Sequence, residues 1–113
     1  MTDRLRLAGV FFDVPADLEE RAVNFWSDAL GADAERSEIR NPYTLLKRPG
    51  QEIGLEVQRL GDGMPRIHID FEVDDVDAEA DRLEGLGATK VSRIETWWVM
   101  KDPAGIVFCL VPK

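Results

Sequence analysis

Apolar and polar residues alternate in two separate stretches of the chain, and each alternation predicts a β-strand. Residues 8–14 read AGVFFDV, with Val10, Phe12 and Val14 on one face. Residues 67–73 read IHIDFEV and alternate over their whole length. In this second strand the apolar face consists of Ile67, Ile69, Phe71 and Val73, and the polar face of His68, Asp70 and Glu72. One face of each strand is therefore expected to pack in a core and the other to carry polar chemistry.

Each of these strands leads into a stretch with the periodicity of an amphipathic helix. In the first helix, expected over about residues 18–30, apolar side chains recur with i, i+4, i+7 and i+8 spacing. Asp17 is expected to cap this helix, with Glu20 completing a capping box. The second helix is expected over about residues 76–86, after an acidic cap signal at residues 74–75.

Each predicted helix ends on the same signal, a leucine followed by glycine and alanine. Gly31 and Gly87 are expected to adopt the left-handed backbone conformation that stops a helix. Three short extended runs then follow each helix, at about residues 34–39, 43–48 and 52–60 and again at about 88–94, 96–101 and 105–111. The pattern predicts a duplicated unit of one strand, one helix and three strands.

The length of 113 residues suits one domain that buries a core of its own. We expect a single domain over residues 1–113, with one module at about 5–60, a linker at 61–65 and a second module at about 66–113. Residues 102–105, DPAG, have the chemistry of a type I hairpin turn in the second module. A chain of this size folds without a disulfide or structural metal, so any metal would be functional.

The charge of the chain narrows the range of partners. The formal net charge is −8, from 22 acidic against 14 basic residues, so the chain repels phosphate backbones and anionic lipid. No apolar run approaches the ~20 residues that a membrane span needs. Cys109 is the only cysteine, which fits a reducing compartment. We therefore expect a cytoplasmic protein that binds neither nucleic acid nor membrane.

Three phrases of the sequence, in this order, resemble one known superfamily. They are NFWSDALGA at residues 24–32, RIHIDFEVDDVD at 66–77 and DPAGIVFCLVP at 102–112. Together with the duplicated unit they resemble the glyoxalase/bleomycin-resistance/dioxygenase superfamily, also called vicinal oxygen chelate, and its glyoxalase-like branch. The resemblance implies an α+β fold in which two βαβββ modules form a curled mixed sheet around a concave cleft with the helices outside. It also implies a small-molecule ligand in that cleft and a homodimer.

The metal enzymes of this superfamily take one ligand from the first and one from the last strand of each module. Carried over to this chain, these positions fall on Gly9, Glu56, His68 and Cys109. Glu56 and His68 match the pattern, whereas Gly9 offers no ligand and Cys109 replaces an acid. The resemblance therefore leaves the cofactor open between none and one divalent metal ion held by His68, Glu56 and Cys109.

Strand parity selects the other candidates. His68 is the only histidine, so an imidazole acid or base must be this residue, with Glu56 as its catalytic partner. Trp97 and Trp98 are adjacent on a strand and point to opposite faces, so one should reach the cleft and stack on a ligand. Four further side chains are candidate ligand contacts, namely Phe11, Asp13, Gln58 and Asp70. A structural histidine, a cysteine that only fills the core and a tryptophan that closes it are the alternatives.

Two functions follow from these positions, and a third is open. The incomplete ligand set and the paired tryptophans favour a metal-free protein that binds a small molecule in the cleft. The alternative is a metal-dependent lyase, isomerase or dioxygenase-type enzyme that uses His68 and Glu56. A stand-alone interaction module with a vestigial cleft is the third. Since fold does not set function, the sequence does not identify the ligand.

Overall fold

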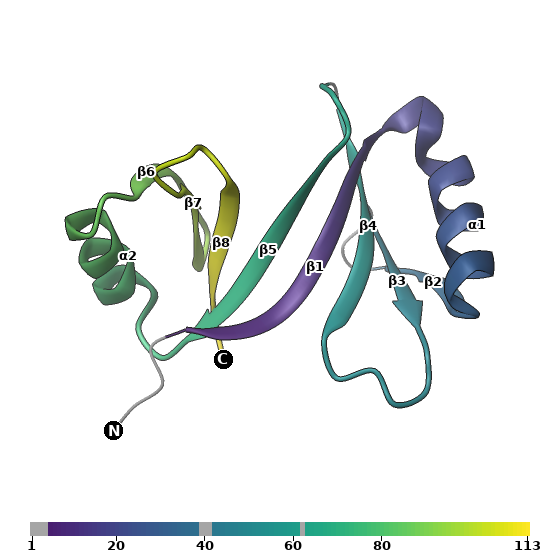
Figure 1. The fold of residues 1–113 in the computed structure, drawn as a ribbon, viewed down its shortest axis with the longest axis horizontal. Coiled ribbons are helices and arrows are strands. Elements are labelled where there is room, and N and C mark those ends of the chain that lie inside the picture. The colour runs from purple at the N-terminus through teal and green to yellow at the C-terminus, as the bar shows by residue number, and fades with distance from the viewer. Residues whose placement is uncertain (1–4, 39–41, 62) are drawn as a thin grey trace. The chain divides into compact units, whose positions relative to one another are not determined.

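The computed structural model describes residues 5–38, 42–61 and 63–113 and shows an α+β fold (Figure 1). The first half contains β1 (Arg6–Pro15), the short 3-10 helix η1 (Ala16–Leu18), α1 (Glu19–Leu30), β2 (Asp33–Arg36), β3 (Tyr43–Lys47) and β4 (Gly54–Leu60). The second half contains β5 (Arg66–Val73), α2 (Val76–Gly85), β6 (Thr89–Ile94), β7 (Trp97–Lys101) and β8 (Val107–Pro112). Each half thus has the predicted order of one strand, one helix and three strands. Neither α1 nor α2 is long and apolar enough to cross a bilayer.

The chain divides into two compact units, which are described separately below. The first unit comprises residues 9–67, and the second comprises residues 68–113 together with the described residues 5–8. The boundaries differ slightly from the predicted modules, because the first residues of β1 group with the second unit. Arg6 illustrates this grouping, since its guanidinium lies 3.2 Å from the carboxylate of Glu72 on β5.

In the first unit the strands lie in the order β2-β3-β4-β1. The β1 and β4 strands are parallel, whereas β3 is antiparallel to both β2 and β4. Helix α1 packs on one face of this sheet, where the indole of Trp26 stacks on the ring of Phe12 with 4.5 Å between centroids. Val57 on β4 is fully buried beside Phe12, its register partner. This face is therefore the core face of the first unit.

The second unit repeats the arrangement with the order β5-β8-β7-β6. The β5 and β8 strands are parallel, and β7 is antiparallel to β8 and β6. Helix α2 lies on one face, and its Val76 and Ala80 join the buried side chains of the strands. The buried members of this core are Val73, Val76, Ala80, Met100 and Leu110. The mixed strand directions and the one helix on the sheet of each unit confirm the predicted α+β fold class.

The two helices begin differently, and one predicted cap is wrong. Asp75 caps α2, since its carboxylate accepts a hydrogen bond from the backbone N–H of Ala78 at 3.0 Å. The N-cap of α1 is Leu18, which makes no side-chain cap bond. Asp17 was expected at this position but lies inside the η1 turn, one residue too early. The extra 3-10 turn after Pro15 moves the start of α1 and removes the predicted capping box.

Both helices end in the same way, as predicted. In α1 the N–H of Ala32 donates to the carbonyl of Ser27 at 2.9 Å, and Gly31 has φ of 64°. In the second unit the N–H of Ala88 donates to the carbonyl of Leu83 at 3.0 Å, and Gly87 has φ of 113°. Positive φ values of this kind cost glycine little, which explains the shared Leu-Gly-Ala signal.

The strand faces lie as predicted in both units, but several residues of the apolar faces are exposed, among them Ile67 at 56% and Ile106 at 57%. In the second unit Phe71 and Phe108 pack against the core under α2, so Asp70 and Cys109 lie on the opposite face. In the first unit Val57 is buried as expected, but Ile53 precedes β4 and is exposed. Alternation with Leu55 and Val57 predicts Ile53 on the core face, and its exposure contradicts that prediction.

The predicted hairpin turn between β7 and β8 is also present. The N–H of Gly105 donates to the carbonyl of Asp102 at 2.9 Å, which closes the turn. The carboxylate of Asp102 accepts two further bonds, from the N–H groups of Ala104 and Ile106. This side-chain bonding explains why an aspartate precedes the proline.

Candidate functional site

The polar face of the second unit is built from three neighbouring strands. Register pairs place Asp70 beside Cys109 and Cys109 beside Val99. The next row on the same face contains Glu72 and Val111, and Val111 is followed on β7 by Trp97, two residues from Val99. Because successive side chains on a strand alternate, His68 shares this face with Asp70. The face thus combines an imidazole, two carboxylates, a thiol and an indole.

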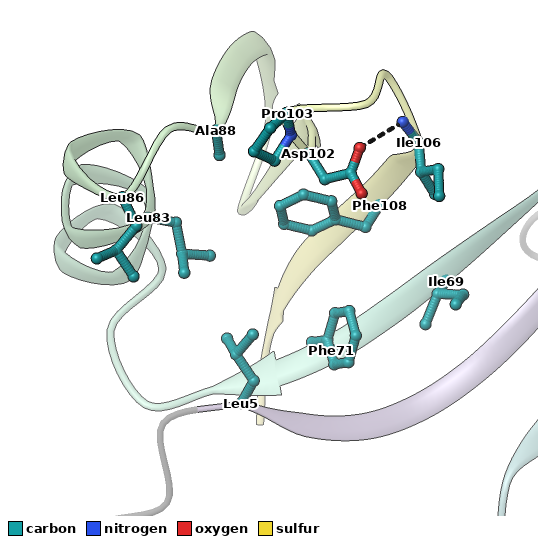
Figure 2. A pocket seen from close by; sticks show the side chains of 10 residues that line it. All are labelled: Leu5, Ile69, Phe71, Leu83, Leu86, Ala88, Asp102, Pro103, Ile106 and Phe108. Atoms are coloured by element: carbon teal, nitrogen blue, oxygen red, sulfur yellow. Dashed lines mark hydrogen bonds between the residues drawn. The ribbon is translucent and has the colours of Figure 1, made fainter.

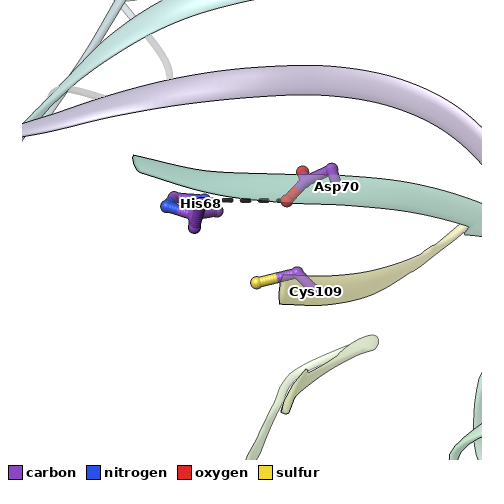
Figure 3. A group of neighbouring side chains, drawn as sticks. All are labelled: His68, Asp70 and Cys109. Carbon is purple, nitrogen blue, oxygen red and sulfur yellow. Dashed lines mark ion pairs between the residues drawn. The ribbon is translucent and has the colours of Figure 1, made fainter. Parts of the chain in front are cut away.

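Three of these side chains converge on one point (Figure 3). The ligand atoms of His68, Asp70 and Cys109 all lie within 4.8 Å of one another. Nε2 of His68 is 3.6 Å from Oδ1 of Asp70, the distance of an ion pair when the imidazole is protonated. His68 is 8% exposed and Cys109 is 7% exposed, so the group is largely shielded from solvent. Water would therefore have little access to a ligand or ion bound there.

The local structure explains how the sequence brings these three residues together. His68 and Asp70 are two residues apart on β5, which puts both on one face. Cys109 joins them because β8 runs parallel to β5 with Asp70 and Cys109 in register. The sequence predicted His68 and Cys109 as ligands of one metal, but it grouped them with Glu56 and treated Asp70 as a ligand contact only. The pairing register was the missing information.

The donor set indicates which groups would fit. One imidazole nitrogen, one carboxylate oxygen and one thiol are a mixed set that suits zinc or cobalt, whereas magnesium and calcium prefer oxygen ligands. Three protein ligands with an open position are typical of catalytic zinc sites. The same three groups can instead bind a polar organic molecule through hydrogen bonds. The set therefore fits a borderline-soft divalent cation and a polar ligand alike.

The two adjacent tryptophans lie on opposite faces of β7, as parity requires. Trp98 is opposite Leu110 of the core, and its indole N–H donates to the carboxylate of Asp77 on α2 at 2.8 Å. Trp97 consequently shares the face of Cys109. Of the two candidates for stacking on a ligand, only Trp97 lies on the same face as His68.

Glu72 and Arg6 add a charged pair to the edge of this face. The carboxylate of Glu72 accepts a hydrogen bond from the guanidinium of Arg6 at 3.2 Å. Arg6 was not a candidate in the sequence, because it precedes the first alternating run and only the tertiary structure brings it to β5. Glu72 is thus paired with Arg6, whereas Asp70 is paired with the imidazole of His68.

The corresponding face of the first unit contains the other predicted side chains. Phe11 is in register with Glu56, and Asp13 is in register with Gln58, so all four lie opposite α1. Asp13 is 1% exposed and lies 3.3 Å from the guanidinium of Arg66. The ring of Phe11 meets that of Tyr43 edge to face at 5.7 Å. Tyr43 and Arg66 are contacts that the sequence did not single out.

Hydrogen bonds on the helix side of the second unit shift the pKa of Asp77, which lies away from the polar face. The pKa of Asp77 is lowered because the Arg93 side chain donates a hydrogen bond to its carboxylate, and the indole of Trp98 donates another. The guanidinium of Arg93 lies 2.9 Å from that carboxylate. These bonds tie β6 and β7 to the first turn of α2 and so hold the strand that carries Trp97.

Comparisons with known proteins agree with this architecture. The family model of the glyoxalase-like domain matches residues 9–111. A methylmalonyl-CoA epimerase from Mycobacterium tuberculosis has a similar structure, with a TM-score of 0.69, 22% identity and coverage of 99% of this chain and 91% of that one. A member of the glyoxalase/bleomycin resistance protein/dioxygenase superfamily from Vibrio splendidus is also similar. Its TM-score is 0.65 at 13% identity, with coverage of 96% of this chain and 99% of that one.

A larger enzyme shares the fold over part of its length. This is 2,2',3-trihydroxybiphenyl 1,2-dioxygenase from Sphingomonas wittichii, with a TM-score of 0.67, 21% identity and coverage of 96% of this chain but 40% of that one. No curated protein matches this chain. At these identities the structural likeness concerns the fold alone.

Proposed function

Because the chain belongs to the glyoxalase-like domain family of the glyoxalase/bleomycin-resistance/dioxygenase superfamily, we propose that it binds a small polar molecule on the face opposite its helices. The observation that supports this proposal most directly is the convergence of His68, Asp70 and Cys109 within 4.8 Å. Trp97 on the same face supplies a flat apolar surface for the ligand. On the equivalent face of the first unit, four side chains stay proposed ligand contacts, namely Phe11, Asp13, Glu56 and Gln58.

The geometry suggests what each side chain does to such a ligand. His68 can donate or accept a hydrogen bond through its imidazole, and Asp70 at 3.6 Å orients the ring. Cys109 supplies a thiol, which is a weak hydrogen-bond donor and can also pack against an apolar part of the ligand. Burial strengthens each polar contact, because water does not compete for it. The site therefore favours a ligand with at least one carbonyl, carboxylate or hydroxyl group.

The test is a ligand screen with variants that keep side-chain size. Hits from a thermal-shift screen of carbonyl and carboxylate compounds are titrated by calorimetry against His68→Gln, Asp70→Asn and Trp97→Phe. We expect about tenfold weaker binding for His68→Gln, the loss of one good hydrogen bond. Trp98→Phe is the matched control, since it alters the neighbouring tryptophan on the core face. The proposal fails if Trp97→Phe and His68→Gln bind every hit as the unmodified protein does.

A second candidate function is a metal-dependent lyase, isomerase or dioxygenase-type reaction, favoured by the mixed donor set. In this reading His68, Asp70 and Cys109 would hold a divalent ion, which would supply Lewis-acid chemistry when bound. Glu56 stays a proposed acid or base on the corresponding face of the first unit. The solved structures of similar fold include an epimerase and a dioxygenase, so small-molecule catalysis occurs on this scaffold.

Metal analysis separates the two candidates. Purified protein is loaded with Co²⁺ and followed by its absorption spectrum, in which a thiolate ligand produces a charge-transfer band. The metal candidate predicts a stoichiometric ion, a band that Cys109→Ser removes and loss of the ion in His68→Ala. An unchanged spectrum after reconstitution removes this candidate and leaves ligand binding without metal.

The expected assembly and location are also proposals. We propose a homodimer, as family resemblance implies, and expect light scattering after size exclusion to give the mass of two chains. A single-chain mass over a wide concentration range would contradict it. A cytoplasmic location is proposed as well, and the acidic net charge of −8 supports the expectation that the protein binds neither nucleic acid nor membrane.

A further inference from the structure

An apolar pocket lies on the helix side of the second unit, away from the polar face just described (Figure 2). Its volume is about 400 Å³. It is lined by Leu5, Ile69, Phe71, Leu83, Leu86, Ala88, Asp102, Pro103, Ile106 and Phe108. Ile69 and Phe71 alternate with Asp70 on β5, so the pocket and the polar cluster open on opposite faces of one strand. The pocket is therefore a separate site.

The lining disfavours an anionic occupant. Its one carboxylate, Asp102, accepts hydrogen bonds from the N–H groups of Ala104 and Ile106 at 2.9 and 2.8 Å. These bonds commit Asp102 to the hairpin turn, and the other lining side chains are apolar. Burying an unpaired charge against such a surface is costly. The volume falls in the range of about 300–1,000 Å³ typical of small-molecule pockets.

The first unit shows what fills the same place there. Counted from the first helical residue, Trp26 is the eighth residue of α1 and Leu83 the eighth of α2, although the hydrogen bonds that end the helices match Leu83 with Ser27. The strand residue beneath each is a phenylalanine next to a fully buried aliphatic side chain on the last strand, Phe12 beside Val57 and Phe71 beside Leu110. The indole of Trp26 stacks on Phe12 with 4.5 Å between centroids and 9° between planes. In the second unit Leu83 is the helix residue on the side of Phe71, and the pocket lies beside it.

We propose that the pocket binds an uncharged planar aromatic molecule of about indole size. Such a ligand stacks on Phe71 as the indole of Trp26 stacks on Phe12. The ring of Phe108 meets that of Phe71 at 76°, so the pocket offers both a ring face and a ring edge to an aromatic guest. Leu83 and Leu86 line the helix side of the pocket (Figure 2) and would cover the guest there.

The first experiment locates binding with indole itself as the probe. Protein with ¹³C-labelled methyl groups is titrated with indole and followed by NMR. We expect the methyl signals of Ile69, Leu83 and Ile106 to shift together with saturation, while that of Val99 on the polar face stays in place. Indole-3-carboxylate, which adds one charge, should bind at least about tenfold more weakly. Shifts confined to Val99 and Val111, or none up to the solubility of indole, overturn the proposal.

The second experiment fills the pocket from within. Leu83→Trp gives α2 a tryptophan as its eighth residue, as in α1, so indole binding should be lost and the melting temperature should rise. Val91→Trp is the matched control, because it places the same side chain on β6 at a position that is 51% exposed and outside the pocket. Leu86→Ser alters an exposed rim residue and should weaken indole binding even if Leu83→Trp does not fold.

Three outcomes contradict the proposal. Unchanged indole affinity in both Leu83→Trp and Leu86→Ser would place the ligand elsewhere. Equal loss of affinity in Val91→Trp would show a general effect of the added indole. Methyl shifts at Leu83 that grow with protein concentration alone, together with a dimer that Leu83→Trp dissociates, would make a second copy of the chain the occupant.

Discussion

Trp26 and Leu83 are each the eighth residue of their helix, yet one fills its side of the sheet and the other borders a pocket. Trp26 stacks on Phe12, whereas the Leu83 side chain lines a space of about 400 Å³ next to Phe71. Strand parity and the parallel pairing below are alike in both units, whereas the hydrogen bonds that end the helices match Leu83 with Ser27, one residue after Trp26. Duplication of the strands therefore conserves which side chains face the helix, and the helix side chain that lies over them decides whether a core or a pocket results.

The polar faces differ in the same manner. In the second unit the first and last strands bring together His68, Asp70 and Cys109. The equivalent register in the first unit pairs Phe11 with Glu56, next to Gly9 paired with Gly54. Only one of the two faces thus has an imidazole and a thiol in neighbouring positions. The repeat supplies two similar surfaces, and the chemistry of the candidate site is concentrated on one.

Both units tie the start of the helix to the outer strand by an acid and an arginine. Glu19, the first residue of α1, lies 3.2 Å from Arg36 on β2, and a second guanidinium, that of Arg59, lies 3.7 Å away. Asp77, the second residue of α2, lies 2.9 Å from Arg93 on β6. Glu19 is buried and Asp77 is exposed. The acid of this tie is therefore buried in the first unit and exposed in the second, while the arginine is exposed in both.

The largest expected losses of stability come from the side chains buried at the centres of the last strands. Leu110→Ala should lower the free energy of unfolding by about 3 kcal/mol and Val57→Ala by about 2 kcal/mol, because leucine loses more buried carbon. Both side chains are fully buried at equivalent register positions. Urea denaturation measures both values. A larger loss for Val57→Ala would show that the equivalence of the two cores is wrong.

The contrast between Trp26 and Leu83 predicts the next largest effect. Trp26→Ala should cost about 2–3 kcal/mol, since it removes a half-buried stacked indole. Leu83→Ala should cost about 1–2 kcal/mol, because Leu83 already borders open space. Thermal and urea unfolding of both variants, compared at one temperature, test the order. Equal costs would mean that the indole stack adds nothing beyond a leucine.

The different starts of the helices predict a smaller effect. Asp75→Ala should destabilise the protein by about 1 kcal/mol through loss of the hydrogen bond to the Ala78 N–H. Asp17→Ala should change stability by less than about 0.5 kcal/mol, because Asp17 caps nothing in η1. Chemical denaturation distinguishes the two. If Asp17→Ala were as costly as Asp75→Ala, the cap predicted from the sequence would be present in solution.

The smallest effect concerns the exposed tie of α2. The pKa of Asp77 is lowered by the hydrogen bond from Arg93 and then by that from Trp98, so Arg93→Ala should raise this pKa towards its usual value near 3.8. A depressed folded-state pKa stabilises the protein above the unfolded pKa, and this contribution is lost as pH falls through the folded value. NMR titration of the Asp77 carboxyl measures the change. Arg36→Ala is the control, and a similar shift there would contradict the assignment.

Local patterns in the sequence were enough to predict the elements and their faces. Period-two alternation places His68 and Asp70 on one face, because every second side chain of a strand points the same way. Glycine after leucine predicted both helix ends, because a positive φ is unfavourable for other residues. The turn at Asp102 was readable for a similar local reason. Each of these features depends on residues only a few positions apart.

Contacts between distant segments were decided by the tertiary structure. Asp70 meets Cys109, and Arg6 meets Glu72, through strand pairing over long stretches of chain. Register depends on how whole faces pack, and a shift of one residue would turn each side chain to the other face. For the same reason parity showed that one tryptophan must lie on each face, and only packing on α2 showed that Trp98 lies inward and Trp97 beside the candidate site.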